Sequence, residues 1–180
     1  MSQEDIRPSR KPYDPYMDKS TKWAVTETIR RIKLPGYKLK DISEDKGIDI
    51  DIIRDSGKSV GGLEIEVKRK WNSEFWEYPN VHFLERKVHF SSIPFSYYII
   101  VSADGSTIVG ISFKELVKHD RFVKDTSDTQ NEEFREVPLK HCFQGWNELQ
   151  MELNRVFLGQ LENDWITDRT RNYRFGQINI

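Results

Sequence analysis

Alternation of apolar and polar residues predicts three consecutive β-strands in the first half of the chain. Apolar side chains recur at about every second position in YKLKDI (37–42), GIDIDIIR (47–54) and GGLEIEVKRK (61–70). This period is typical of a strand that buries one face. The segment RDSGKSVGG, which joins the second and third strands, is rich in turn-forming residues. We therefore expect these two strands to pair as a hairpin around residues 55–62.

Apolar residues that recur with a helical period predict helices near both ends of the chain. The first covers residues 20–34, where Ser20 or Thr21 can cap the start and a Pro-Gly pair follows the end. The second covers residues 146–161, whose apolar residues form one stripe. A further helix is predicted over residues 80–89, in an aromatic-rich segment.

Two more strands are predicted in the middle of the chain. The continuous apolar run SYYIIVSA (96–103) is typical of a strand buried on both faces. Asp104-Gly105 then turns the chain into STIVGIS (106–112), which completes a hairpin. The order of elements predicts an α/β domain over residues 21–162, with a central mixed β-sheet flanked by helices. Residues 1–20 are expected to form a flexible N-terminal arm, and residues 163–180 a C-terminal tail.

Composition narrows the class of protein. The 180 residues are 37% hydrophobic and 32% charged, which is typical of a globular domain with a hydrated surface. No apolar run approaches the roughly 20 residues that span a bilayer, so no membrane partner is expected. Cys142 is the single cysteine, which excludes an internal disulfide and favours a reducing, cytoplasmic location. A net charge of -1 counts against a non-specific nucleic-acid binder, although the local distribution of charge matters more.

Carboxylates gather on the polar faces of the two strands of the expected hairpin. Asp49 and Asp51 share one face, and Glu64, Glu66 and Lys68 share a face of the next strand. In a hairpin around residues 55–62, Asp51 and Glu66 would converge with Lys68 beside them. Facing carboxylates repel unless a cation lies between them, and Mg²⁺ prefers such oxygen ligands. A lysine beside the ion can hold a phosphate or activate water, so the pattern predicts phosphodiester hydrolysis.

Asp51, followed after a turn by Glu66-Val67-Lys68, resembles the restriction-endonuclease-like nucleases of the PD-(D/E)xK superfamily. The likeness includes the order of elements and covers about residues 21–111. It implies a restriction-endonuclease-like fold, with Asp51 and Glu66 as metal ligands and Lys68 as the catalytic lysine. In this family a glutamate of the first helix often joins the site, and here it would be Glu27. Asp49 shares the face of Asp51 and competes for its role.

The same resemblance implies an endonuclease that cuts DNA with Mg²⁺, for which Mn²⁺ can substitute, and it allows a homodimer. Candidate nucleic-acid-binding residues are Arg69 and Lys70, directly after Lys68, and Arg86 and Lys87 in the predicted 80–89 helix. Aromatic residues that follow Lys70 can stack on bases, although such clusters more often belong to a core. These aromatic residues are Trp71, Phe75, Trp76 and Tyr78.

Other interpretations of the same residues stay open. The charged strands can form a solvent-facing sheet with cross-strand ion pairs. The chain can also be a non-catalytic nucleic-acid-binding or scaffold protein that keeps the nuclease fold. The basic and aromatic tail can be a nucleic-acid arm, an oligomer contact or a strap over the core. His119, His141 and Cys142 are expected to be structural, because sequence neighbours rarely both ligate one metal without a wider pattern.

Overall fold

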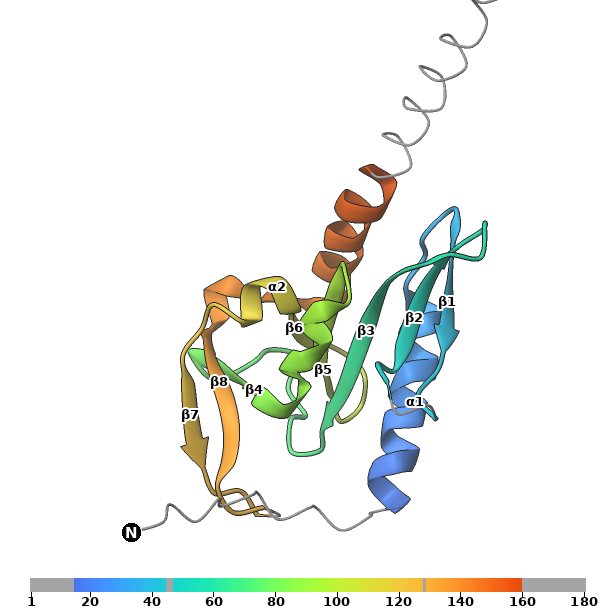
Figure 1. Ribbon diagram of the computed structural model, residues 1–180. Helices are drawn as coiled ribbons and strands as arrows, with labels where there is room; N and C mark the ends of the chain where they lie inside the picture. The colour runs from blue at the N-terminus through green and yellow to red at the C-terminus, as the bar shows by residue number, and fades with distance from the viewer. Residues whose placement is uncertain (1–14, 45–46, 128, 160–180) are drawn as a thin grey trace, which may run out of the picture.

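A six-stranded mixed sheet forms the centre of the molecule (Figure 1). The computed structural model describes residues 15–44, 47–127 and 129–159. In spatial order the sheet contains β1 (Tyr37–Asp41), β2 (Ile50–Arg54), β3 (Ser59–Lys68), β5 (Ser96–Ser102), β6 (Ile108–Ser112) and β9 (Phe143–Gln144). Strands β3 and β5 are parallel and the other neighbours are antiparallel. This confirms the predicted α/β class with a central mixed sheet.

A second sheet of three antiparallel strands was not predicted. It contains β4 (Asn80–Leu84), β8 (Glu132–Pro138) and β7 (Arg121–Lys124). The predicted helix over residues 80–89 is therefore wrong in its first half, and η1 (Glu85–Ser92), a 3-10 helix, follows β4. Val81 and Phe83 explain the strand, because they alternate along it, are fully buried and pair with β8.

Helices cover one face of the large sheet. Helix α1 spans Pro15–Arg31 and begins before the predicted start, with a proline in its first turn, where the missing N–H costs no hydrogen bond. Val25 of α1 and Leu149, Leu153 and Phe157 of a helix over residues 145–159 pack into one core with the sheet. Most of the predicted N-terminal arm and the whole predicted C-terminal tail lie outside the described residues.

The small sheet covers the other face of the large sheet. Side chains of β4 and β8 form a second core with η1, with α2 (Phe113–Leu116) and with the opposite faces of β5 and β6. Successive residues of β5 show the division, since Tyr97 and Ile99 belong to the first core and Tyr98 and Ile100 to the second. A short 3-10 helix, η2 (Leu139–His141), leads from β8 to β9.

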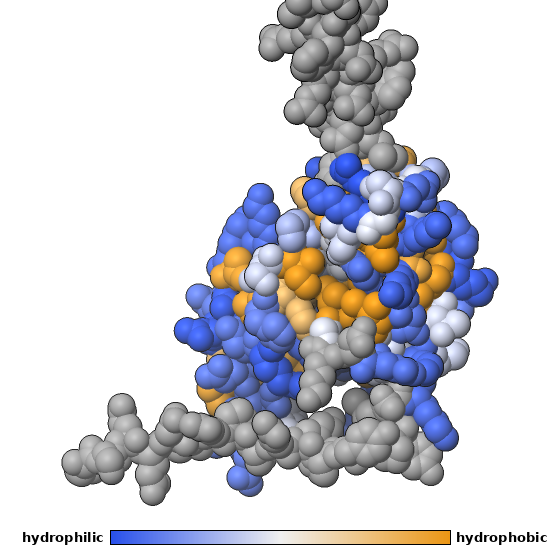
Figure 2. Space-filling model, turned by 45° about the vertical axis from the view of Figure 1, so that its right-hand side comes forward, coloured by the Kyte–Doolittle hydropathy of each residue, from blue (hydrophilic) through white to orange (hydrophobic). Residues whose placement is uncertain are grey.

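Alternation along β3 decides where its charged residues point. Leu63, Ile65 and Val67 pack into the core beneath the helices. Glu64, Glu66 and Lys68 consequently project from the opposite face of the large sheet, on the side of the small sheet. Figure 2 shows hydrophilic residues over most of one side of the molecule, with apolar residues gathered across its middle. None of the described helices is both long enough and apolar enough to cross a membrane.

Candidate active site

The register of β2 and β3 determines which carboxylates of the two strands meet. Asp51 is paired with Gly62. Glu66 lies four residues further along β3, an offset of about 13 Å at 3.3 Å per residue. The sequence led us to expect Asp51 and Glu66 to lie together, but the structure keeps them apart. Extending the ladder by one residue places Asp49, rather than Asp51, opposite Glu64.

A short turn accounts for this difference in register. The backbone N–H of Arg54 donates to the carbonyl oxygen of Lys58 at 2.9 Å, and Gly57 between them has a φ of 88°. The turn is thus only four residues long, and Gly61 and Gly62 lie inside β3. Near this turn the Oδ1 atom of Asp51 accepts a hydrogen bond from Ser59 Oγ at 2.6 Å.

Asp49, directly before β2, and Glu64 of β3 are buried carboxyl groups, 9% and 2% exposed. Asp49 Oδ2 accepts a hydrogen bond from the backbone N–H of Ile65 at 2.7 Å. This contact places the Asp49 carboxylate against β3 at Ile65, beside Glu64. Burial, followed by the charge of Asp49, raises the pKa of Glu64 to about 7, and burial also raises the pKa of Asp49.

Lys87 of η1 compensates part of this negative charge. Its Nζ atom donates a hydrogen bond to Glu64 Oε1. The other oxygen, Glu64 Oε2, is buried and receives no hydrogen bond from an N–H or O–H group of the other described residues. A hydrogen bond between the Glu64 and Asp49 carboxyl groups acts to lower the pKa of Asp49, against the larger effect of burial. Buried carboxyl groups with raised pKa values are characteristic of sites that bind cations or transfer protons.

We call Asp49, Glu64 and Glu66 together the acidic face. Glu66 and Lys68 form its open end. Glu66 Oε1 lies 3.0 Å from Lys68 Nζ, and Glu66 Oε2 accepts a hydrogen bond from the Tyr98 hydroxyl at 2.5 Å. Burial, with the charge of Glu66, raises the pKa of Tyr98 well above 10, so its hydroxyl remains a donor. The Lys68 side chain is 36% exposed and its Glu66 partner 18%. The ammonium group of Lys68 therefore reaches solvent beside a fixed carboxylate.

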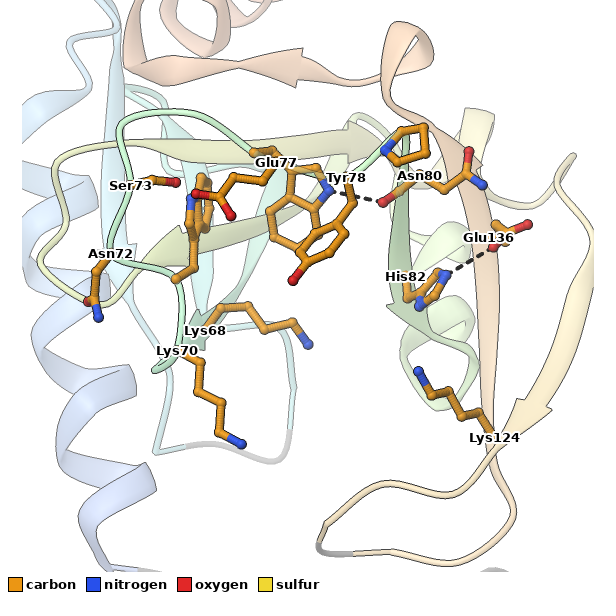
Figure 3. A pocket seen from close by; sticks show the side chains of 13 residues that line it. Lys68, Lys70, Asn72, Ser73, Glu77, Tyr78, Asn80, His82, Lys124 and Glu136 are labelled. Atoms are coloured by element: carbon orange, nitrogen blue, oxygen red, sulfur yellow. Dashed lines mark hydrogen bonds and ion pairs between the residues drawn. The ribbon is translucent and has the colours of Figure 1, made fainter.

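A pocket of about 680 Å³ adjoins Lys68. Lys68 extends into it from the end of β3 and Lys124 from β7, and Figure 3 shows their amino groups pointing toward one another. His82 and Glu136 on the small-sheet wall form a pair at 3.0 Å. The remaining lining residues are Lys70, Trp71, Asn72, Ser73, Trp76, Glu77, Tyr78, Pro79 and Asn80. The charged residues that line this pocket are therefore three lysines and two glutamates, apart from His82.

The aromatic residues after β3 divide between the core and the surface. Trp71 is buried and meets Trp76 edge to face at 5.1 Å between ring centroids. Trp76 Nε1 donates to the carbonyl oxygen of Asn80 at 2.9 Å, which holds the loop against β4. Phe75 and Tyr78 are 74% and 65% exposed. The two tryptophans thus form the pocket wall, and the other two rings are accessible to a ligand.

The structure gives three other candidate residues, Glu27, Arg86 and Arg69, different surroundings. Glu27 pairs with Arg30 at 2.7 Å and Arg31 at 2.6 Å, which lowers its pKa to about 2. It belongs to α1, across the sheet from the acidic face, so the structure does not bring it to Glu66. Arg86 pairs with Glu132 at 3.4 Å. Arg69 follows β3 and is exposed.

The sequence did not single out Tyr98 and Lys124. Tyr98 stands in a continuous apolar run, where a hydroxyl that serves a carboxylate has no separate signal. The parallel pairing of β3 with β5 places Tyr98 beside Glu64 and within reach of Glu66. Lys124 is on a short strand of the small sheet, which was not predicted.

Comparisons with known proteins give one structural likeness. No protein-family model matches the chain, and no relative was found among curated proteins. Among solved structures, the chain is similar to D212, a nuclease from a fusselovirus, with 16% identity and a TM-score of 0.41. The likeness covers 83% of this chain and 90% of that one. A likeness with this identity and this TM-score assigns no property of that protein to this chain.

Proposed function

We propose that the chain is a metal-dependent nuclease that hydrolyses phosphodiester bonds in DNA on the acidic face of β2 and β3. The proposal depends mainly on one contact, the hydrogen bond from the Ile65 N–H to Asp49 Oδ2. This bond holds the carboxylate of Asp49, the residue before β2, against Ile65 of β3, whose neighbours in the chain are Glu64 and Glu66. Lys68 follows Glu66 on the same face of β3 and lines an open pocket, so a carboxylate and an amine are paired where that pocket begins.

The donor atoms of this face suit a Mg²⁺ ion. Mg²⁺ prefers carboxylate oxygens and is usually held by one or two of them. Asp49 and Glu66 would hold the ion, with Glu64 beside them offering a buried oxygen that receives no hydrogen bond from an N–H or O–H group of the other described residues. Asp51 stays a proposed ligand from the sequence, but the register favours Asp49. When bound, Mg²⁺ or Mn²⁺ polarises a phosphoryl oxygen and lowers the pKa of its bound water.

The protein's own groups have separate tasks in this proposal. Lys68, held at 3.0 Å from Glu66, places its ammonium group where it can bind a phosphate oxygen or orient the attacking water. Tyr98 fixes the second oxygen of Glu66, so this carboxylate keeps one orientation. Glu27 remains a candidate only through the family resemblance, because its carboxylate is engaged by two arginines of its own helix.

The pocket beside Lys68 is suited to a nucleic-acid strand. Lys70 and Lys124 provide cations for neighbouring phosphates. Tyr78 at its edge, and Phe75 in the same loop, are exposed rings on which bases can stack. Arg69, Arg86 and Lys87 complete the proposed DNA-binding set. Arg86 and Lys87 are each paired with a glutamate in the free protein. To bind DNA, each would leave its glutamate and pair with a phosphate group instead.

One observation favours a second candidate, a non-catalytic nucleic-acid-binding protein. The Lys87 ammonium group already sits on Glu64 and partly neutralises the acidic face. A face balanced in this way can persist without an ion and still present the lysine-rich pocket. This candidate predicts binding with a steep salt dependence and no cleavage with any metal.

A cleavage assay with matched variants separates the two candidates. Plasmid, linear duplex, single-stranded and branched DNA, and RNA, are incubated with the protein in Mg²⁺, Mn²⁺ or EDTA. We expect cleavage with either metal and none in EDTA, and a loss of about 100-fold or more in Lys68→Ala and Glu66→Gln. Lys58→Ala, at the exposed hairpin turn, is the matched control for the lysine. Binding without cleavage in every metal would leave only the second candidate.

Two further variants identify the aspartate ligand. Asp49→Asn is expected to lose activity together with Glu66→Gln, whereas Asp51→Asn is expected to keep most of it. The reverse result would move the ligand to Asp51 and require a shift in the register of the hairpin. Light scattering on the same preparations tests the homodimer that the family resemblance allows.

A further inference from the structure

Within the described part of the chain, two of the four connections between the large sheet and the small one meet at one group of side chains. The first connection passes from β6 through α2 to β7, and the second passes from β8 through η2 to β9. In Figure 1, α2 lies beside the end of β8, where the second connection begins. Glu115 and His119 belong to the first connection and His141 to the second. One candidate ligand atom from each of the three residues lies within 4.8 Å of the other two.

The distances are close to those of a metal site. Glu115 Oε1 is 3.8 Å from His119 Nε2 and 3.9 Å from His141 Nδ1. Ligand atoms about 2.1 Å from a tetrahedral ion are about 3.4 Å apart, so each of these two distances needs to shorten by about 0.5 Å. The third distance, between the two histidine nitrogens, is within 4.8 Å. The two imidazole rings meet edge to face, with centroids 5.2 Å apart. Side-chain rotation alone can supply such an adjustment.

Two hydrogen-bonding features also point to a ligand. His119 Nε2 is buried and has no hydrogen-bond partner among the residues that the structure describes. A buried polar atom in that condition costs free energy unless something binds it. Lys118 donates a hydrogen bond to Glu115 Oε2, which leaves Oε1 as the oxygen turned toward both histidines. The lysine thus fixes the carboxylate in the way that outer-shell partners fix metal ligands.

We propose that Glu115, His119 and His141 form a Zn²⁺ site that ties these two connections between the sheets. Two imidazoles and one carboxylate suit Zn²⁺, whereas Mg²⁺ is held by oxygen ligands alone. Glu115 and His141 also line a cavity of about 710 Å³, so water can reach a fourth position on the ion. Cys142 is not a ligand in this proposal. It is buried in the second core, and burial raises the pKa of its thiol to about 12.

This site is separate from the acidic face of β3. Its residues are on α2, on the turn after α2 and on η2, whereas the proposed nuclease residues are on β2 and β3. Its role would be to hold the small sheet in place against the large sheet. An ion that binds only the folded protein raises the melting temperature. At 100-fold excess over its dissociation constant, a rise of about 5–10 °C is expected for a domain of this size.

Metal titration of the full chain tests the site. Chelator-treated protein is titrated with Co²⁺, whose visible absorption reports coordination by nitrogen and oxygen, and Zn²⁺ is then added to displace it. We expect one equivalent of Zn²⁺ per chain and the rise in melting temperature given above. The same two measurements are made on His141→Ala and Glu115→Gln, and on His89→Ala as a control, since His89 is an exposed histidine of η1.

The variants separate a metal site from three side chains that are merely close. His141→Ala and Glu115→Gln should weaken Zn²⁺ binding at least 10-fold and abolish the thermal shift, while His89→Ala behaves as the unmodified chain. His141 is 39% exposed, so its removal leaves the core intact and the variant folds. Glu66→Gln should bind Zn²⁺ normally, which makes the result independent of the proposed nuclease activity. The proposal fails if the unmodified chain binds no Co²⁺ or Zn²⁺, or if His141→Ala keeps its affinity and thermal shift.

Discussion

Replacing Glu64 with glutamine should stabilise the protein at pH 8, although Glu64 is one of its most deeply buried polar residues. Burial and the neighbouring Asp49 raise the pKa of Glu64 from 4.5 to about 7. Above that pH the carboxylate is ionised in surroundings that oppose its charge. Glutamine keeps the shape of the neutral acid and retains an oxygen that can accept a hydrogen bond from Lys87.

The size of the effect follows from linkage between protonation and folding. Between pH 4.5 and 7 the unfolded chain has released the proton of this group while the folded protein still holds it, so the free energy of unfolding falls as the pH rises. At 1.36 kcal/mol for each unit of pKa difference, the loss at pH 8 is about 3 kcal/mol, and at pH 5 it is below about 1 kcal/mol. Glu64→Gln removes this loss, and Asp49 also loses a like-charged neighbour.

Urea unfolding followed by tryptophan fluorescence, in EDTA at pH 5 and at pH 8, measures the two free energies. Glu44→Gln is the matched control, because this side chain is 82% exposed and its replacement should change the free energy of unfolding by less than about 0.5 kcal/mol. Glu27 and Asp104 have pKa values lowered to about 2, so their titration falls below the range compared. Subtracting the unmodified chain from the variant leaves the change at Glu64 together with its effect on the neighbouring Asp49.

Two results would refute this reasoning. One is a Glu64→Gln variant that is no more stable than the unmodified chain at pH 8. The other is a gain of the same size at pH 5 and pH 8, because the effect would then have no connection with ionisation. If the expected gain is found, it shows that the acidic face is held at a cost in stability, as sites with a chemical function often are.

Three other perturbations test the packing, the cysteine and the pocket. A Cβ atom on Gly61 would lie 2.7 Å from the carbonyl oxygen of Phe95, so Gly61→Ala should cost about 1–3 kcal/mol in urea unfolding, whereas Gly47→Ala, which meets nothing within 4 Å, should cost almost nothing. Equal costs would contradict the close approach. Burial raises the pKa of Cys142 to about 12, so its reaction with a thiol reagent at pH 8 should be many times slower in the native protein than in urea, and equal rates would place the thiol at the surface. Lys124→Ala should weaken DNA binding and reduce the slope of log affinity against log salt by about 1, and an unchanged slope would remove Lys124 from the DNA-binding set.

The sequence predicted five of the six strands of the large sheet, all except β9, because their pattern is local. Alternation in residues 47–54 and 61–70 identified both strands and placed Glu64, Glu66 and Lys68 on one face. The register of these two strands could not be predicted from the sequence, because it depends on which residues form the turn. A four-residue turn at Gly57 and a bulge between Ile52 and Ile53 move the pairing by about four residues, which separates Asp51 from Glu66 and places Asp49 opposite Glu64.

Contacts between segments far apart in the chain could not be predicted from the sequence either. The small sheet pairs β4 with β8, about 50 residues later, and each strand is short. Without that sheet, residues 80–89 were predicted to form a helix, and nothing placed Lys124 near Lys68. The proposed zinc ligands show the same limit. Glu115 and His119 are four residues apart and detectable as a pair, but only the fold brings His141 to them.

The central claim is that the acidic face of β2 and β3 binds a divalent cation. Anomalous diffraction from crystals soaked in Mn²⁺ tests it most directly, at a concentration that supports cleavage. The account predicts a peak in contact with Asp49 and Glu66, and its loss in Glu66→Gln crystals. A face without a peak, with Lys87 still the only cation on Glu64, would contradict it.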